Sequence, residues 1–241
     1  MIHKLCGTNW GASADVLRTY TISLVVSVVD FGSPVWLNSK QVSVVDVQVN
    51  ETLRKISGTL KSTPLPWLPV LANIRPSELR RKNALKNLIT NTRFNENSLL
   101  FEDLKEKPPE RLVSRAAIWK ITDAAMYFEP NREWKISWEN SSVFNNECIT
   151  DPSLKVNGFS LLRKVWVTLN RVRTCQGRCN ATLHKWNMVE SAKCDCGALE
   201  QSIPHSVLFC PLRRFDGDFM ELCQCSSNRS IDWLTNIDIN L

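Results

Sequence analysis

The feature that most constrains this chain is a cysteine–histidine spacing near its C-terminal end, Cys194-x-Cys196-x8-His205-x4-Cys210. Zinc takes four ligands at tetrahedral corners, with sulfur at about 2.3 Å and nitrogen at about 2.0–2.1 Å. A close cysteine pair on a turn, followed by a histidine and a cysteine from a second element, supplies such a set. The spacing therefore predicts a small zinc-binding module.

The residues around these four suit that interpretation. Gly197 directly follows the cysteine pair, where the backbone must turn away without a side chain in its path. Pro204 suits the first position of a short helix that carries the histidine into the site. Pro211 discourages continuation of that helix beyond the last cysteine. The alternative interpretation is a set of buried thiols beside a surface histidine.

Other cysteines and histidines could compete for the metal. Cys175, Cys179 and His184 could form a partial second site, which lacks a clear fourth ligand. Cys223 and Cys225 could supply that ligand or replace members of the first set. The competition stays open at this point.

The cysteine count and the apolar segments bear on the compartment. Nine cysteines are an odd number, and the chain is too long and too poor in glycine for a secreted disulfide scaffold. Residues 1–10 lead into no apolar signal-peptide segment. The most apolar run, residues 22–29, is far shorter than the ~20 residues of a membrane helix. We expect an intracellular protein, cytoplasmic or nuclear or both, that does not engage a membrane.

Positive charge is concentrated in two stretches. Residues 160–215 hold nine Lys or Arg against three Asp or Glu, and residues 75–93 hold six against one. Clustered positive charge favours a polyanionic partner such as RNA or DNA, although a solvated helix face remains the alternative for 75–93. The candidate contacts are Arg163, Lys164, Arg171, Arg173, Arg178, Lys185, Arg213 and Arg214, with Trp186 as the candidate for base stacking.

Helical patterns dominate the chain and predict a mainly α fold. A helix over 16–29, capped by Ser13, is apolar on nearly every face and is expected to be buried. The proline-punctuated segment 63–69 cannot be helical throughout. The helix over 161–173 is amphipathic, with Arg163, Lys164 and Arg171 opposite its apolar arc. The other expected helices cover 40–57, 75–91, 113–128 and 131–138.

Patterns of the common catalytic sites are absent from the sequence. The chain has three histidines and lacks G-x-S-x-G, P-loop and H-E-x-x-H motifs. A polymerase palm has paired aspartates, and two-metal phosphoryl transfer needs clustered carboxylates. In this sequence no two aspartates are adjacent. We expect no catalytic activity and no small-molecule substrate.

Several segments resemble one family. The sequences Gly-Thr-Asn-Trp-Gly-Ala at 7–12, Gly-Ser-Pro-Val-Trp at 32–36 and Thr-Pro-Leu-Pro-Trp-Leu-Pro at 63–69 look like a reverse-transcriptase thumb of jockey-type non-LTR retrotransposons. Trp-Val-Thr-Leu-Asn-Arg at 166–171 and Cys-Asp-Cys-Gly at 194–197 resemble the C-terminal region of the same proteins. The resemblance covers about the first 90 residues and residue 159 onwards.

This resemblance implies a helical thumb-like bundle in residues 1–93, a helical connector and linker in 94–158, and a basic helix with the Cys/His zinc module in 159–241. It implies that RNA or target DNA contacts the basic thumb helix and the zinc module. It also implies that the endonuclease and the catalytic palm lie upstream of this chain. Cys6 and Cys175 depart from the family pattern, which suggests relaxed constraint.

Two alternatives to a non-catalytic nucleic-acid-binding fragment remain. One is an accessory part of an RNA-directed DNA polymerase that works with a palm supplied elsewhere. The other is the product of a decayed element with no function.

Overall fold

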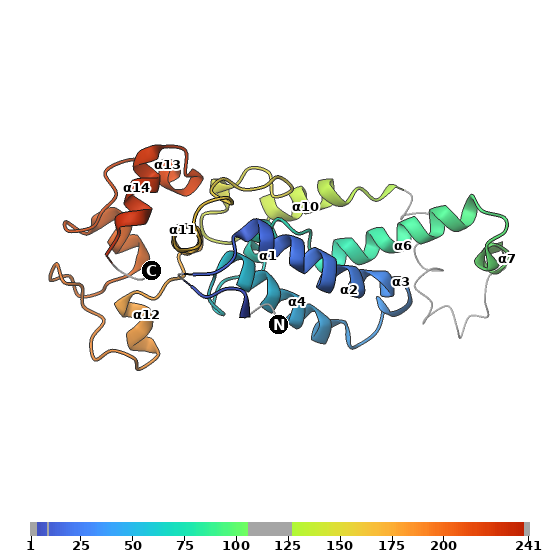
Figure 1. Ribbon diagram of the computed structural model, residues 1–241, viewed down its shortest axis with the longest axis horizontal. Coiled ribbons are helices and arrows are strands. Elements are labelled where there is room, and N and C mark those ends of the chain that lie inside the picture. Colours follow the sequence, from blue (N-terminus) through green and yellow to red (C-terminus); the bar gives the residue numbers. More distant parts are fainter. Residues whose placement is uncertain (1–3, 9, 106–126, 239–241) are drawn as a thin grey trace.

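A computed structural model describes residues 4–8, 10–105 and 127–238 (Figure 1). These residues are mainly helical, and the part of the chain they represent has no β-strand beyond an isolated bridge between Cys6 and Gly11. The helices are α1 (Ala14–Thr21), a π-helical segment η2 (Ile22–Val26), α2 (Ser27–Phe31), α3 (Ser33–Trp36), α4 (Val42–Ser57), α5 (Trp67–Ala72), α6 (Ser77–Arg93), α7 (Leu99–Lys105), α10 (Pro130–Glu139), the 3-10 turn η4 (Asn146–Cys148), α11 (Arg163–Thr174), α12 (Asn180–Lys185), the π-helical turn η5 (His205–Phe209), α13 (Phe219–Gln224) and α14 (Asn228–Asn236).

The molecule is elongated (Figure 1). Helices α1, α2 and α3 follow one another along its length, and α4 and α6 run beside them, with α3 against α6 and α1 against α4. Helices α12, α13 and α14 gather at the end opposite α7. Helix α11 stands between these two groups and contacts α4, α13 and α14.

The first helix begins as predicted but is not buried as predicted. The Ser13 side chain accepts a hydrogen bond from the backbone N–H of Val16, and α1, η2 and α2 continue one another to Phe31. Leu24 and Val28 are nevertheless exposed. The apolar sequence did not reveal this, because the neighbouring helices cover one side of the run only.

Helices α4 and α6 confirm the predictions for 40–57 and 75–91, but the charge of α6 is largely internal. The buried Arg80 guanidinium lies 2.9 Å from the Asp30 carboxylate. The buried Arg81 donates to both oxygens of Asp46, at 2.6 and 3.0 Å. These two arginines anchor α6 to its neighbours, so the expected nucleic-acid contact of the basic helix does not hold for them.

Helix α11 confirms the predicted helix at 161–173, but its expected polar face is wrong. Every residue of α11 except Lys164 is buried. The helix is covered by α4 on one side and by α13 and α14 on the other. A residue opposite the apolar arc is therefore also enclosed, and its polar groups must find partners inside the protein.

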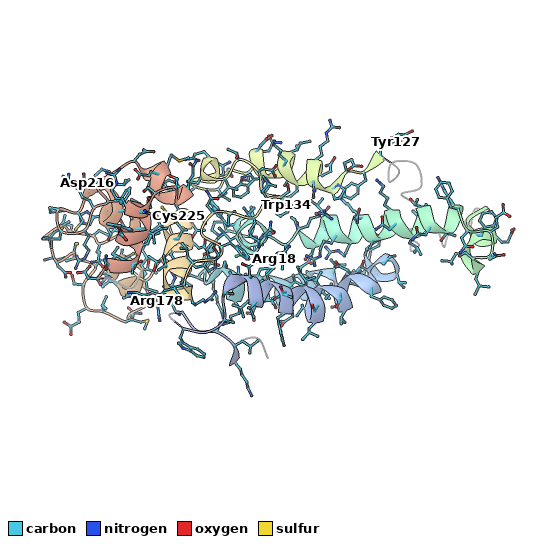
Figure 2. All side chains as sticks on the ribbon, turned by 45° about the horizontal axis from the view of Figure 1, so that its top comes forward. Arg18, Tyr127, Trp134, Arg178, Asp216 and Cys225 are labelled. Atoms are coloured by element: carbon cyan, nitrogen blue, oxygen red, sulfur yellow. The ribbon has the colours of Figure 1, made fainter. Side chains whose placement is uncertain are left out.

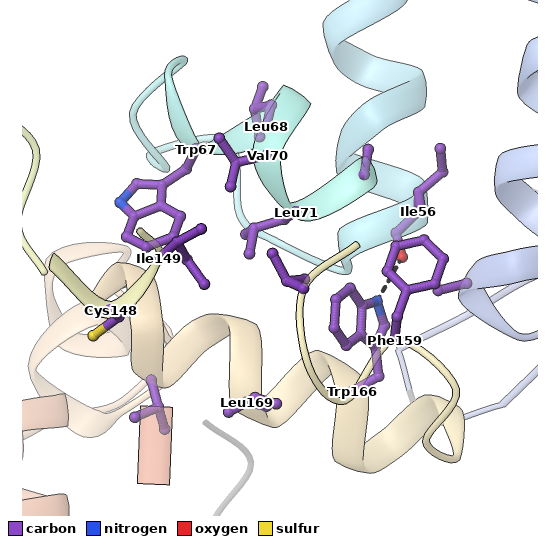
Figure 3. Close-up of a cluster of buried hydrophobic side chains, with 14 of the residues drawn as sticks. Ile56, Trp67, Leu68, Val70, Leu71, Cys148, Ile149, Phe159, Trp166 and Leu169 are labelled. Atoms are coloured by element: carbon purple, nitrogen blue, oxygen red, sulfur yellow. Dashed lines mark hydrogen bonds between the residues drawn. The ribbon is translucent and has the colours of Figure 1, made fainter. Parts of the chain in front are cut away.

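One buried cluster of apolar side chains includes residues from Cys6 to Ile237, and Figure 3 shows part of it. The indole N–H of Trp166 donates to the Ile56 carbonyl at 3.0 Å, and the Phe159 ring packs edge-on against Trp166 with centroids 5.1 Å apart. Burying such large rings is the main favourable contribution to folding. The cluster draws on residues of 1–93, 94–158 and 159–241; that division of the chain stays a prediction.

Three smaller predictions can be compared with the structure. Helix α10 confirms the helix expected at 131–138, whereas most of the helix expected at 113–128 lies outside the described residues. The segment 63–69 is non-helical up to Pro66, and α5 begins at Trp67. None of the described helices is both long enough and apolar enough to cross a membrane.

Candidate metal centre

The four predicted ligands lie together in space. The ligand atoms of Cys194, Cys196, His205 and Cys210 all lie within 4.8 Å of one another. The sulfurs of Cys194 and Cys210 are 3.8 Å apart, and Sγ of Cys196 is 3.2 Å from Nε2 of His205. Two sulfurs at tetrahedral corners about 2.3 Å from a zinc ion would lie about 3.8 Å apart. The cluster could therefore hold a metal ion through three sulfurs and one nitrogen.

A tight turn presents the first two cysteines. The backbone N–H of Gly197 donates to the Cys194 carbonyl at 2.9 Å, and the N–H of Cys194 donates to the Ala198 carbonyl at 3.0 Å. Gly197 has a φ of +93°, while a Cβ added to it would meet nothing within 4 Å. The backbone angle, and not a lack of space, therefore favours glycine here. The sequence predicted the turn, but its steric reason for the glycine was wrong.

A π-helical turn, η5, presents the histidine and the last cysteine. Pro204 precedes this turn, and the Ser202 hydroxyl accepts from the His205 N–H at 3.3 Å. The N–H of Cys210 then donates to the His205 carbonyl at 2.7 Å. This bond closes the turn and brings His205 and Cys210 to the same side.

Hydrogen bonding prepares one thiol for metal binding. Burial disfavours the charged form of Cys194, but hydrogen bonds from the Cys196 backbone and from the Cys196, His205 and Cys210 side chains outweigh it and lower the pKa of Cys194 to about 6. The thiolate is the form that binds metals. The cluster thus stabilises a charged sulfur at a buried cysteine.

Arg213 was predicted to contact nucleic acid, but its guanidinium contacts the cluster and two carboxylates of the chain instead. Its guanidinium donates to Sγ of Cys194 at 3.8 Å and forms ion pairs with the carboxylates of Asp195 and Asp238. The side chain is only 9% exposed. Arg213 therefore links the cysteine turn to Asp238, and ion pairs with two surface carboxylates of the chain take the place of its predicted contact with nucleic acid.

Gln201 connects the cluster to helix α12. Its side-chain N–H donates to Sγ of Cys194 at 3.8 Å, while its side-chain oxygen accepts from the N–H of Asn180 at 3.0 Å. Its backbone carbonyl accepts from the N–H of Ala181 at 3.1 Å. The first N–H groups of a helix have no partner within the helix. Gln201 supplies the acceptors for two of these N–H groups, so the segment between Cys196 and His205 holds the start of α12 in place.

The competing cysteines and His184 do not join this cluster. Within the described ranges, Cys194, Cys196, His205 and Cys210 form the one group whose ligand atoms are close enough to share an ion. Cys175 instead accepts a hydrogen bond from the Asn145 amide at 3.7 Å, and burial raises the pKa of its thiol to about 11. All nine cysteines lie in the described residues, and none forms a disulfide.

Three arginines predicted to touch nucleic acid are buried. Arg163 donates to the carbonyls of Lys55 and Ile56, both at 2.6 Å, and Arg171 donates to that of Gly58 at 3.3 Å. The last carbonyls of a helix lack partners within it and attract cations, so both arginines complete the end of α4. Arg173 has no exposed surface and donates to two backbone carbonyls and to a side-chain oxygen.

The remaining candidates lie at the surface. Trp186 is 42% exposed at the end of α12, and Figure 2 labels Arg178 near the same helix. Lys164 reaches the Thr235 carbonyl at 3.4 Å with its ammonium group. The exposed members of the predicted set are Lys164, Arg178, Lys185, Trp186 and Arg214.

Comparisons with known proteins give the chain no relatives. No family model matches it, no curated protein matches it, and no solved structure matches it. The case for a function therefore rests on the cluster and its surroundings.

The sequence did not single out Gln201 or the cations at the end of α4. Gln201 lies seven residues after Cys194, within the segment between the ligands, but a glutamine there has no characteristic spacing. Arg54, Lys55 and Lys61 are scattered along a helix end and a loop. They form one group with the arginines of α11 and with Arg178 only in the folded chain, where all of them line one groove.

Proposed function

We propose that the Cys/His cluster holds a zinc ion and that this ion stabilises the C-terminal part of the chain. The observation that carries the proposal is the convergence of four ligand atoms within 4.8 Å from two separate turns. Three thiolates and an imidazole, with no open position, are typical of structural zinc sites. The bound ion would offset two of the three thiolate charges, which lowers the cost of keeping them together.

Metal analysis of the purified chain tests this proposal. We expect one equivalent of zinc in the wild type and loss of that equivalent in Cys210→Ser and His205→Ala. Cys225→Ser is the matched control, because it makes the same chemical change at a half-buried cysteine outside the cluster. A wild type without stoichiometric metal, or variants that keep it, would refute the zinc site.

We further propose that the module binds RNA or DNA without catalysis. The support is the exposed cations Arg178, Lys185 and Arg214, which flank the cluster in the sequence, together with the exposed ring of Trp186. Cations that contact phosphates release counterions, so the affinity falls as salt rises. An affinity for single-stranded oligonucleotides that does not change with salt would contradict this proposal, as would unchanged binding after complete removal of zinc.

The resemblance to jockey-type retrotransposon proteins supplies a setting for this activity. In that setting the helical bundle of α1 to α6 corresponds to a reverse-transcriptase thumb, and the zinc module follows it. The chain would then act inside the cell, in the cytoplasm or the nucleus, where the template RNA and target DNA are found.

A second candidate function is supported by the exposed apolar residues of the first helices. Val28, Phe31 and Val35 are 73%, 93% and 87% exposed. Such a surface is costly in water and marks sites of contact with other proteins, and a polymerase palm supplied elsewhere is the partner this candidate requires. Adding the chain to a reverse transcriptase that lacks its own C-terminal part should restore primed synthesis. If synthesis does not increase, or increases equally with Phe31→Ser, this candidate is wrong.

A further inference from the structure

A groove lies where α11 packs on the end of α4, beside α12. It encloses a cavity of about 780 Å³. One wall is the C-terminal part of α4 and the loop that follows it, and the other is formed by α11 and the residues on either side of α12. Residues 6–8 line the groove as well. The cations that line the groove are Arg54, Lys55, Lys61, Arg163, Arg171 and Arg178, and Glu51 is the acidic residue among its lining side chains.

The floor of the groove carries positive charge that the fold holds in place. Arg163 and Arg171 are fixed by their hydrogen bonds to the carbonyls at the end of α4. Burial, followed by the charges of Arg178 and Arg163, lowers the pKa of Arg171 to about 10. The three guanidinium groups line the same groove, where their like charges repel one another. An anion in the groove would relieve that repulsion without any rearrangement of the fixed pair.

The rim of the groove differs from its floor. Arg178 and Lys61 lie on opposite walls and are exposed. Trp186 also lines the groove and leaves 42% of its surface open. An exposed indole beside cations is the arrangement with which proteins stack an unpaired base while binding its phosphates. A duplex does not offer such a base, because its bases are already stacked inside the helix.

We propose that this groove binds single-stranded nucleic acid, with backbone phosphates between Lys61, Arg178 and the floor arginines and one base stacked on Trp186. This inference rests on the proposed nucleic-acid binding and assigns it to one groove, where residues that the sequence singled out meet Lys61, which it did not. It also gives Arg163 and Arg171 a second role, since they complete the end of α4 and supply the charge of the groove floor. RNA and DNA share the chemistry that the groove recognises.

The experiment measures binding of fluorescently labelled single strands of RNA and of DNA to the full chain across a range of salt concentrations. Lys61→Gln and Arg178→Gln remove one rim cation each from opposite walls. We expect each to lower the slope of log affinity against log salt by about 0.7, the value of one single-strand phosphate contact. Trp186→Ala should weaken binding about 5- to 150-fold, as the loss of one stacked base does.

Two controls keep these results specific. Arg93→Gln makes the same charge change at the far end of α6 (Figure 1) and should leave both affinity and slope unchanged. Strands that carry 5-bromouracil should photo-crosslink to Trp186, which peptide mapping by mass spectrometry identifies. All variants alter exposed side chains, and thermal melting confirms that each is folded.

The outcomes separate the groove from the broader proposal. If the wild type binds strands, and Arg214→Gln weakens binding while the three groove variants do not, the groove is overturned and nucleic-acid binding stands. If the wild type binds no strand at low salt, both the groove assignment and the proposed nucleic-acid binding are refuted. If a blunt duplex binds as tightly as a single strand, or the crosslink maps to another residue, the single-strand assignment is overturned.

Discussion

Replacing Gly58 by alanine should destabilise the protein through two separate effects. Gly58 ends α4 with a φ of +71°, a conformation that costs a residue with a Cβ about 1–2 kcal/mol. The added Cβ would also lie 2.2 Å from a methyl carbon of Val167. Val167 is buried in α11 and its branched side chain has little rotational freedom there. Such overpacking costs about 1–3 kcal/mol.

The expected loss for Gly58→Ala is therefore about 2–5 kcal/mol in the free energy of unfolding. Urea unfolding followed by far-UV circular dichroism measures it. Gly32→Ala is the matched control: the φ of Gly32 is −92°, and its added Cβ would first meet Trp36 at 3.5 Å, an ordinary contact. That variant should change stability by less than about 0.5 kcal/mol.

A double-mutant cycle separates the two effects. In a Val167→Ala background the two methyl carbons are gone and only the Cβ of residue 167, at 2.9 Å, still crowds the new side chain. Gly58→Ala should therefore cost less than in the wild type, but more than the backbone part of about 1–2 kcal/mol. Additive losses would show that α4 and α11 do not meet as closely as described. A Gly58→Ala protein as stable as the wild type would refute the packing of α11 on the end of α4, and with it the floor of the groove.

Three further predictions concern the anchors of the cluster and of α6. Gln201→Leu should keep the metal but weaken single-strand binding, because α12 loses its link to the cluster; parallel metal analysis and binding assays check this, and loss of metal alone would contradict it. Arg213→Met should weaken metal affinity about 10- to 100-fold in a chelator competition, since it removes a contact that supports a ligand; an unchanged affinity would show that the ion pairs do not support the site. Asp46→Asn should lower the free energy of unfolding by about 1–3 kcal/mol, because it leaves the charge of the buried Arg81 without its carboxylate; urea unfolding with no change would mean that the pair does not anchor α6.

The sequence predicted those features that depend on local chemistry. A hydroxyl before an apolar run predicted the start of α1 at Ser13, and the spacing of the four ligands predicted their convergence. The turn at Gly197 was predicted correctly, but the reason given, a side chain in the way, was wrong: the space is open and the positive φ favours glycine. These features are set by residues that are near one another in the chain or that share one strong chemical preference.

Features that depend on distant packing were not predictable in the same way. Arg163 and Arg171 were expected at the surface because they lie opposite an apolar arc. They are buried because the end of α4, more than a hundred residues earlier, needs donors for its carbonyls. Phe31 is exposed because none of the described helices covers it. The periodicity of the sequence identifies apolar residues but does not show whether a neighbour covers them.

The central claim is a zinc site made of three cysteines and one histidine, and X-ray absorption spectroscopy at the zinc edge tests it most directly. The purified chain should show three sulfur scatterers at about 2.3 Å and one nitrogen at about 2.0–2.1 Å. His205→Ala should lose the nitrogen, and Cys210→Ser one sulfur, in any molecules that retain metal. A spectrum without sulfur neighbours, or a folded chain that binds no zinc at all, would contradict the claim.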